Sequence, residues 1–381
     1  MDYFLTDEHK RIREVARDLV ERVIKPTRRK YDESHDFPYD VIGEIAKAGM
    51  FKIFVPKEYG GTGGGVMDMC IAAEEIARGC GGFATAYAVG ALGGFPIVLF
   101  GNEEQKKRYL PKIATGEMLC AFALTEPDAG SDAGSIKTTA SKDGDHYILN
   151  GVKQFITNGG IAHVYTVIAM TDKSRGARGA SAFLVEKGDA GFSAGKQEDK
   201  LGIRASLTSQ LLFEDCRVPK NNLMGKEGLG FVYAMRNFDR ARPGVGALAL
   251  GIAQGAFEAV MEFGRDFGLL GSQFFQEKIA DMAAEIEAGR ALTYACARVI
   301  DAGIKEFTKD SSFVKLYCSD LAMKITLEAI ALMGPHGVLK DYGVEKMARD
   351  AKITQIYEGT NEIQRTVIGL ELIREAGSKK G

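Results

Sequence analysis

The sequence contains no tryptophan and only five histidines among 381 residues. None of the histidines stands at a triad spacing from a serine or cysteine, so they do not indicate nucleophilic catalysis of the Ser/Cys-His type. Cysteine is also sparse, and the six residues form no CxxC pair and have no close histidine. This pattern argues against a zinc site and favours a reducing compartment with buried free thiols. The cysteines are Cys70, Cys80, Cys120, Cys216, Cys296 and Cys318.

We find no run of 18 or more apolar residues and therefore expect no segment that spans a membrane. The N-terminus opens on Asp2, Asp7 and Glu8, which suits neither a signal peptide nor an arginine-rich transit peptide. The formal net charge of −2 gives no reason to expect nucleic acid or an anionic membrane as a partner. We therefore expect a cytoplasmic protein.

Glycine is abundant, with 46 residues, and 45% of the residues are hydrophobic. A chain of this length can form two or three domains with a large core. The distribution of residue types changes twice along the chain, near residue 119 and near residue 227. The sequence predicts an N-terminal helical domain at 1–118, a middle β domain at 119–226 and a C-terminal helical bundle at 227–381.

Apolar residues at helical spacing predict five helices in the first part. Thr6 is the expected N-cap of the first helix, and Pro26 is its expected end. A glycine-rich loop follows the second helix but has neither GxGxxG spacing after a strand nor a P-loop lysine, so it does not predict a phosphate site. The helices are expected at Thr6–Ile24, Tyr39–Ala48, Val66–Cys80, Gly82–Phe100 and Glu103–Ala114.

Short β-rich runs separated by turn residues predict an antiparallel barrel or sandwich in the middle part. Within it, His146–Ile156 resembles a hairpin, with Asn150-Gly151 fitting a type I′ turn. The strands are expected at Cys120–Leu124, Ile136–Ser141, His146–Leu149, Val152–Thr157, Val164–Met170, Ser181–Val185 and Ser209–Phe213.

Long helical patterns with short links predict an antiparallel four-helix bundle after Gly230. Pro243 is expected to kink the first bundle helix or to mark its re-entry. The fold class is thus mainly α with a central β domain. The helices are expected at Phe231–Phe263, Phe274–Asp301, Ser312–Met333, Glu345–Gln355 and Glu362–Glu375.

The segment Arg349–Arg365, RDAKITQIYEGTNEIQR, contains the strongest candidate for chemistry. Glu358 stands where one helical pattern ends and another begins, and Thr360 or Asn361 can cap the second helix. A carboxylate in a half-apolar corner tends to have a raised pKa and can serve as a general base. Taken alone, the segment also fits a solvated loop acid.

Three other segments could bind a ligand. Phe122–Ala133 is rich in small, hydroxyl and acidic residues, Phe155–Gly160 sets an aromatic ring beside Thr157, and Phe238–Pro243 carries two arginines. They suit a polar ligand, a flat heterocycle and phosphates, respectively. A plain loop explains the first segment equally well, an ordinary strand end explains the second better when it is taken alone, and a solvated charged face is the alternative for the third.

Across essentially its whole length the sequence resembles the acyl-CoA dehydrogenase family, whose architecture is also helices, a β-barrel and a helix bundle. The motifs that carry the resemblance occur in the family's order. They are Leu124-Thr-Glu-Pro-Asp-Ala-Gly-Ser-Asp132, Asn150-Gly-Val-Lys-Gln-Phe-Ile-Thr-Asn-Gly159, Lys200-Leu-Gly-Ile-Arg204, Phe213-Glu-Asp-Cys-Arg-Val-Pro219 and Arg349-Asp-Ala-Lys-Ile-Thr-Gln-Ile-Tyr-Glu-Gly-Thr360.

The resemblance implies that Glu358 removes the α-proton of an acyl-CoA thioester while the β-hydrogen leaves as hydride to N5 of FAD, giving a 2-enoyl-CoA. It also implies that the backbone N–H of Glu358 and a ribityl hydroxyl stabilise the developing enolate. The implied FAD-binding residues are Phe122, Leu124, Thr125, Ser131, Phe155, Thr157, Arg265, Gln273, Thr360 and Glu362. The implied substrate-binding residues are Ser131, Asp239, Arg242, Tyr357 and Gly359. No metal is expected.

Two segments depart from the family's pattern. Arg265–Gln273 is several residues shorter than usual and lacks a proline, and Ala331 and Gly334-Pro335-His336-Gly337 replace a glutamine and a Gly-Gly-x-Gly run. Both lie on the expected ADP and subunit-contact side, so the assignment of Arg265 and Gln273 to FAD is the least supported.

The family also implies an electron-transfer flavoprotein as electron acceptor and a homotetramer. Glycines at Gly90, Gly93, Gly94, Gly244 and Gly246 suggest room for a short, branched or alicyclic acyl group, although they would equally allow close helix packing. An acyl-CoA oxidase, a flavin monooxygenase of the same fold and a non-catalytic CoA-binding scaffold are the alternatives. Glu358 weakens the monooxygenase alternative, because that chemistry needs no α-proton base there.

Overall fold

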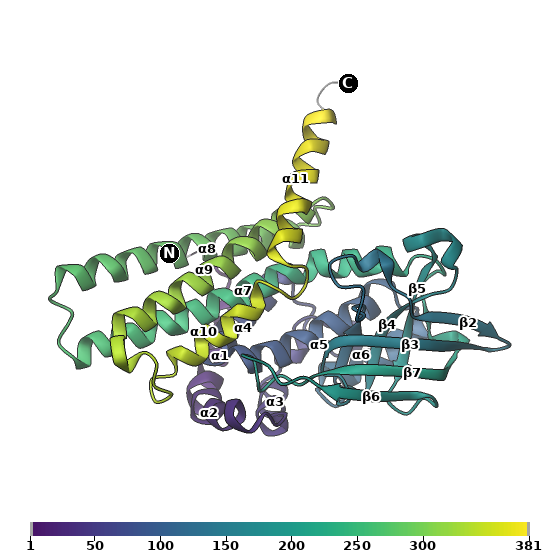
Figure 1. The fold of residues 1–381 in the computed structure, drawn as a ribbon, viewed down its shortest axis with the longest axis horizontal. Coiled ribbons are helices and arrows are strands. Elements are labelled where there is room, and N and C mark those ends of the chain that lie inside the picture. Colours follow the sequence, from purple (N-terminus) through teal and green to yellow (C-terminus); the bar gives the residue numbers. More distant parts are fainter. Residues whose placement is uncertain (1–2, 379–381) are drawn as a thin grey trace.

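The computed structural model describes residues 3–378, in which the sheet lies at one end of the molecule and the helical bundle extends to the other end (Figure 1). The N-terminal helices pack between the sheet and the later bundle, and the order of elements agrees with the predicted fold class. Their bounds are α1 (Asp7–Leu19), α2 (Lys25–Ser34), α3 (Tyr39–Lys47), α4 (Val66–Gly79), α5 (Gly81–Phe100) and α6 (Glu103–Ala114). The division into three domains at 118 and 226 stays a proposal.

The start of α1 is capped as predicted. The Thr6 hydroxyl accepts a hydrogen bond from the His9 backbone N–H at 3.2 Å, and His9 Nδ1 accepts from the Thr6 N–H at 3.2 Å. The predicted end at Pro26 is wrong. A π-helical turn at Val20–Ile24 leads directly into α2, whose first turn contains Pro26, so the proline lies within a continuous helical stretch.

The middle part forms one mixed sheet of eight strands among the described residues. Most neighbours are antiparallel, in the order β6-β7-β3-β2-β4-β5-β8, and β1 pairs with β4 in parallel. The sheet has its own apolar core, separate from the large helical one. The strands are β1 (Cys120–Ala123), β2 (Thr139–Asp143), β3 (His146–Thr157), β4 (Val164–Met170), β5 (Ala180–Glu186), β6 (Phe192–Gln197), β7 (Thr208–Pro219) and β8 (Leu223–Met224).

The predicted hairpin turn at Asn150-Gly151 is wrong, because β3 runs through both residues. Its register with β7 shifts there, which makes the pair a β-bulge rather than a turn. Asn150 exchanges two hydrogen bonds with Asp215 across the strands, and Gly151 has a φ of 147° and abuts Thr138. A bulge and a type I′ turn both favour Asn-Gly, so composition does not separate them.

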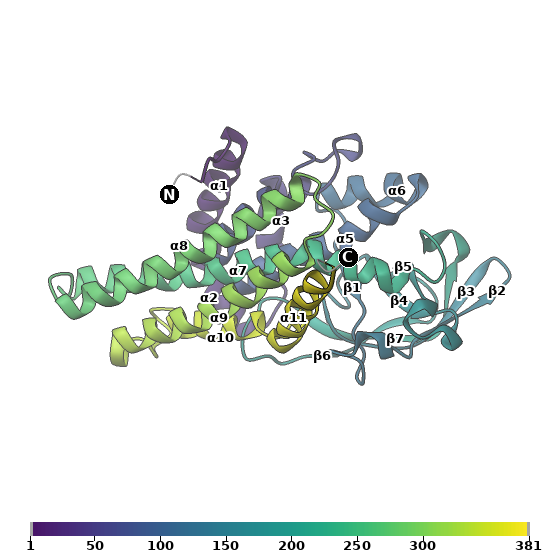
Figure 2. The ribbon, with the colours of Figure 1, turned by 90° about the horizontal axis from the view of Figure 1, so that it is seen from above.

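The C-terminal helices run side by side, and the last one projects away from them (Figures 1 and 2). α7 is one helix that includes Pro243, so this proline does not mark a re-entry. Gln364 N donates to Thr360 O, and Ile363 N to Thr360 Oγ1, so Thr360 caps the last helix as predicted. The bounds are α7 (Gly230–Asp266), α8 (Gln273–Asp301), α9 (Thr308–Met333), α10 (Val344–Thr354) and α11 (Asn361–Ser378).

Two helices, α5 and α7, are long and apolar enough to cross a membrane by length and composition, contrary to the expectation that no such segment exists. Their apolar windows are 72% and 67% buried inside the protein. Both helices lie between other elements, as Figure 1 shows, and such burial is typical of core helices.

Most of the glycines that suggested room for substrate serve close packing instead. A Cβ atom at four of the five positions would come closer than 3.0 Å to a neighbouring atom, whereas Gly244 has open space. The neighbours are Phe51 Cε1 for Gly90 (2.8 Å), Ala121 N for Gly93 (2.8 Å), Phe54 Cε2 for Gly94 (2.8 Å) and Val314 Cγ1 for Gly246 (2.4 Å). These glycines therefore allow helices and strand β1 to approach.

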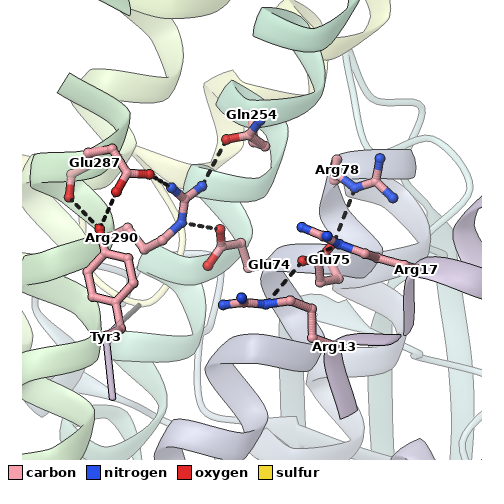
Figure 3. A pocket seen from close by; sticks show the side chains of 9 residues that line it. All are labelled: Tyr3, Arg13, Arg17, Glu74, Glu75, Arg78, Gln254, Glu287 and Arg290. Atoms are coloured by element: carbon pink, nitrogen blue, oxygen red, sulfur yellow. Dashed lines mark hydrogen bonds and ion pairs between the residues drawn. The ribbon is translucent and has the colours of Figure 1, made fainter. Parts of the chain in front are cut away.

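A network of charged side chains joins α1 and α4 to α7 and α8 around a polar cavity of about 270 Å³ (Figure 3). At its centre Glu74 accepts hydrogen bonds from Arg290 Nε at 2.8 Å and from the Tyr294 hydroxyl at 2.7 Å. Glu75 likewise accepts from Arg17 at 3.0 Å and from Arg78 at 3.2 Å. Burial and the Glu74 carboxylate raise the pKa of Tyr294. The arginine and glutamate side chains that line this cavity form ion pairs with one another. We therefore interpret the cavity as a packing contact between helices rather than as a ligand site.

Replacing Glu74 with alanine is expected to lower stability by about 3–5 kcal/mol, because it leaves the buried Arg290 and Tyr294 without their shared acceptor. Asp18→Ala is the matched control, since Asp18 forms an exposed, solvent-screened ion pair with Arg22 and its loss should leave Tm nearly unchanged. Thermal unfolding scans at one heating rate measure both. Equal shifts in Tm for the two variants would contradict a stabilising role of the network.

Candidate active site

A second cavity, of about 670 Å³, lies between α5, the ends of the strands, α7 and the connection from α10 to α11. It is larger than the polar cavity between α1, α4, α7 and α8, and its lining is mostly apolar, as in sites that bind organic ligands. The structure brings ten of the residues singled out in the sequence to its wall. They are Phe122, Leu124, Thr125, Ser131, Phe155, Thr157, Tyr357, Glu358, Gly359 and Thr360.

Glu358 lies in the short connection between α10 and α11 with a φ of 54°, a left-handed conformation that is uncommon for a residue with a side chain. Hydrogen bonds from one residue of the next helix hold this conformation. Gln364, fully buried in the next helix, donates its side-chain N–H to the carbonyl oxygens of Glu358 at 3.2 Å and of Gly359 at 3.0 Å. Strain of this kind persists only where the surroundings enforce it, and it is frequent at active sites.

The carboxylate of Glu358 is not that of a solvated loop acid. Its Oε2 atom is sealed from solvent and has no hydrogen-bond partner among the described residues. Burial raises the pKa of Glu358 from 4.5 to about 7, against the opposing effect of Arg242 and Lys315. The group can therefore both lose and accept a proton near neutrality, which suits a general base.

The backbone N–H of Glu358 is also unused, since it donates to no group within residues 3–378. The N–H of Tyr357 donates to Ile353, and that of Asn361 donates to Gln355, so the main chain on either side is satisfied. A free donor beside a partnerless carboxylate can stabilise negative charge that develops on a ligand oxygen.

Aromatic and hydroxyl side chains line the same cavity. Phe155, at a φ of 57°, leaves 61% of its side chain exposed, and Thr157, Thr125 and Ser131 line the wall near it. An exposed ring among hydroxyls is suited to a flat heterocycle that carries polar edges. These residues therefore fit a flavin.

A buried ion pair supports this wall from behind. Lys153 is fully buried and donates to Glu126 Oε1 at 2.7 Å and to the Leu124 carbonyl at 2.9 Å. The same Glu126 accepts the backbone N–H groups of Lys137 and Thr138. Burial lowers the pKa of Lys153 to about 8, although Glu126 opposes the effect. The pair fixes Leu124 and Thr125 to β3, which carries Phe155.

Five of the residues expected in the site do not line the cavity. Asp239 and Arg242 pair with each other at 2.8 Å, mostly buried in α7 close to Gly359. Arg265, Gln273 and Glu362 are exposed. Arg265 pairs with Asp266 and Gln273 with Glu277, where α7 meets α8 at the end of the bundle far from the sheet (Figure 1). A single chain does not bring these three residues to the cavity.

Other wall residues were not anticipated from the sequence. Thr85, Ala88, Val89 and Leu92 of α5 line the cavity together with residues 198–203. The uncharged composition of α5 was a signal for burial but not for a ligand-facing side, because its apolar residues surround the helix. Among residues 3–378 no group of three or more His, Cys, Asp or Glu side chains could hold a metal ion.

Family models cover nearly the whole chain. The acyl-CoA dehydrogenase N-terminal domain matches residues 6–117, the middle domain matches 121–216 and the C-terminal domain matches 228–373. A relative from Clostridium acetobutylicum, "Acyl-CoA dehydrogenase, short-chain specific", is 45% identical over 98% of this chain and 100% of its own length. "Cyclohexane-1-carbonyl-CoA dehydrogenase" from Geobacter metallireducens is 43% identical over 98% and 100%.

Solved structures agree with these matches. Butyryl-CoA dehydrogenase from Megasphaera elsdenii superposes with a TM-score of 0.95 at 42% identity, covering 98% of this chain and 100% of that one. A chain from the structure of the "Electron transferring flavoprotein of Acidaminococcus fermentans: Towards a mechanism of flavin-based electron bifurcation" superposes with a TM-score of 0.95 at 44% identity, with the same coverage. The chain thus belongs to the acyl-CoA dehydrogenase family, flavoprotein oxidoreductases that act on the CH–CH bonds of acyl-CoA.

Proposed function

We propose that this protein oxidises an acyl-CoA thioester to the 2-enoyl-CoA, with Glu358 as the base that removes the α-proton. The observation that carries the proposal is the partnerless Glu358 carboxylate at the wall of the large cavity. A base without a competing hydrogen bond is free to meet a C–H group of a ligand, and its pKa of about 7 matches the working range of a general base.

The α-proton of a thioester is very weakly acidic, so the charge that develops on the thioester oxygen needs a donor. The unused backbone N–H of Glu358 can supply one hydrogen bond from the same residue that takes the proton. Because Gln364 holds the carbonyls of Glu358 and Gly359, this segment needs little rearrangement when the substrate binds. Tyr357 forms part of the wall and helps to exclude water.

FAD is the cofactor that this proposal requires, and when bound it would supply the hydride acceptor for the β-hydrogen. Phe122, Leu124, Thr125, Ser131, Phe155, Thr157 and Thr360 would hold it, as their place on the cavity wall and the family's flavoprotein nature support. Ser131, Tyr357 and Gly359 would also contact the acyl-CoA.

The substrate is proposed to be a short, branched or alicyclic acyl-CoA. The names of the Clostridium and Geobacter relatives support this range of acyl groups. In this chain Val89 and Leu92 of α5 and Phe238, Val245 and Leu248 of α7 add bulk to the cavity wall. Such a wall favours a compact apolar group over a long flexible chain.

We propose that an electron-transfer flavoprotein is the electron acceptor. We also propose that the protein forms a homotetramer and that it is located in the cytoplasm. The similarity to a chain from the Acidaminococcus electron-transferring flavoprotein structure supports the first. Exposed Leu370, Leu372 and Ile373 on the projecting helix α11 support association with further subunits. All six cysteines are buried and free, which suits a reducing compartment.

The purified protein is expected to be yellow and to bleach when an acyl-CoA is added without oxygen. Glu358→Gln removes the base but keeps the side-chain shape, so bleaching should slow by about 10³-fold or more while the ligand still binds. The measurement is anaerobic stopped-flow absorbance over short, branched, cyclic and long acyl-CoAs.

Glu44→Gln is the control, because Glu44 forms an exposed ion pair with Lys47 on α3. Bleaching of the Glu358→Gln variant at near wild-type rate would reject Glu358 as the base. A colourless protein that takes up no FAD would favour a non-catalytic scaffold. Fast peroxide formation on reoxidation in air would favour an oxidase, and fastest turnover of long straight-chain esters would overturn the substrate range.

The rate is expected to depend on pH through Glu358. Since only the ionised carboxylate can take the α-proton, kcat/KM should rise with pH and reach half its plateau near pH 7 rather than near 4.5. A profile of kcat/KM from pH 5 to 9 with a short acyl-CoA measures this, with FAD absorbance recorded at each pH to exclude loss of cofactor. A flat profile between pH 5.5 and 8 would show that the pKa of the base is not raised.

A further inference from the structure

Helix α9 carries a buried lysine that the catalytic assignments do not use. Lys315 is fully buried, and the acceptor that the structure gives its ammonium group is Asn361 Oδ1, at 2.7 Å. An ammonium carries three donors, and burying one is costly unless its charge is compensated. A fully buried lysine with one hydrogen bond therefore needs an electrostatic reason to be there.

Asn361 connects this lysine to the segment that carries Glu358. It is the first residue of α11, three residues after Glu358, and its side-chain N–H groups donate to Ser319 Oγ at 2.9 Å and to Asp320 Oδ1 at 2.7 Å. Its oxygen accepts from Lys315 and, at 3.1 Å, from Ser319. All four polar contacts of the Asn361 side chain thus run to α9.

The other end of the segment is fixed to the same helix. Gln355, three residues before Glu358, donates its side-chain N–H to Asp320 Oδ1 at 2.6 Å, and its carbonyl accepts from the Asn361 N–H at 3.0 Å. The seven residues from Gln355 to Asn361 therefore form a closed loop whose two ends meet on one carboxylate of α9. The connection can hold Glu358 at a positive φ because both of its ends are fixed.

Charge as well as geometry links the lysine to the base. Arg242 and, less strongly, Lys315 are the two cations that oppose the rise in the pKa of Glu358. Burial lowers the pKa of Lys315 to about 7, and Glu358 is the first anion that opposes this fall. Arg242 is already engaged with Asp239 at 2.8 Å, whereas Lys315 has no carboxylate in hydrogen-bond contact among the described residues. Lys315 is thus a second cation beside Glu358, after Arg242, and the one without a carboxylate partner of its own.

The charged and titratable groups around this pair come from every element that packs on it. They are Asp239 and Arg242 on α7, Asp320 on α9, Asp350 on α10, Tyr357 in the loop and Glu362 on α11. Of these, Asp239 is paired with Arg242, Asp320 with Gln355, Asn361 and Arg365, and Asp350 with Lys346. Glu362 is exposed, so solvent screens it.

We propose that Lys315 is the positioning residue of the active site: its bond to Asn361 fixes the loop that presents Glu358, and its charge favours the basic form of that carboxylate. The proposal rests on the proposed role of Glu358 as the base. Lys315 does not line the cavity and acts through Asn361 and through its field, so it contacts neither substrate nor cofactor.

Two variants separate the charge from the bond. Lys315→Met removes both, and Lys315→Gln removes the charge but keeps a donor that can reach toward Asn361. Lys324→Met is the matched control, because Lys324 lies on the same helix and forms an exposed pair with Glu285. The readouts are the pH profile of kcat/KM, KM and kcat separately, FAD absorbance, and anaerobic exchange of the substrate's α-hydrogen in D2O.

In both variants the acid limb of the kcat/KM profile is expected to move to higher pH by about one unit, which is a loss of about tenfold below pH 7 and little loss at pH 9. The α-hydrogen exchange should shift in the same way, KM should change by less than about threefold, and Lys315→Met should also have a lower kcat at pH 9 than Lys315→Gln. Lys324→Met should match wild type.

An unshifted profile in either folded variant would overturn the proposal. So would loss of FAD and of folded protein in both variants, because Lys315 would then be a structural residue. These outcomes differ from a failure of the proposed function, in which wild type itself would neither bleach with any acyl-CoA nor exchange its α-hydrogen.

Discussion

The carboxylate of Glu358 is withdrawn from water, its Oε2 atom has no hydrogen-bond partner within residues 3–378, and much of the surrounding structure depends on that fact. The difference between a pKa of 4.5 and one of about 7 corresponds to about 3 kcal/mol against the ionised form. A protein can tolerate this only if the rest of the fold supplies stability and if the charge is partly compensated nearby. The helical core and the cations of α7 and α9 meet these two conditions separately.

Rigidity around the site comes from buried polar pairs rather than from the loop itself. Lys153 and Glu126 fix the wall that carries Thr125, and Asp320 joins both ends of the loop that carries Glu358. Each pair links segments far apart in sequence, so the two walls of the cavity belong to different elements held at a defined separation. Such an arrangement holds the two walls of the cavity in place before any ligand binds.

The helices and most strands could be predicted because their apolar periodicity and end signals are local. The bounds of α6 and β4 follow the sequence pattern to the residue. The prediction of a turn at Asn150-Gly151 was wrong for a physical reason. A turn and a bulge favour the same residues, and only the pairing of β3 with β7 decides between them. The prediction that the first helix ends at Pro26 was wrong for a similar reason, because a proline is compatible with both the end of one helix and the first turn of another.

Some residues of the candidate site could likewise be predicted from the sequence, and others could not. The motifs singled out Glu358, Thr125 and Phe155, which line one cavity, whereas Lys315 had no local signal in the sequence. In the sequence Lys315 is one of three lysines of α9, and the expected place for a lysine is the solvent-exposed surface. Its burial arises only when α9 meets Asn361, 46 positions later, and its hydrogen bond needs the side chain of Asn361 in one rotamer. Residues expected to contact a ligand can thus be found from their type and spacing in the sequence. A residue that positions them, such as Lys315, is found only from the packing that brings it to them.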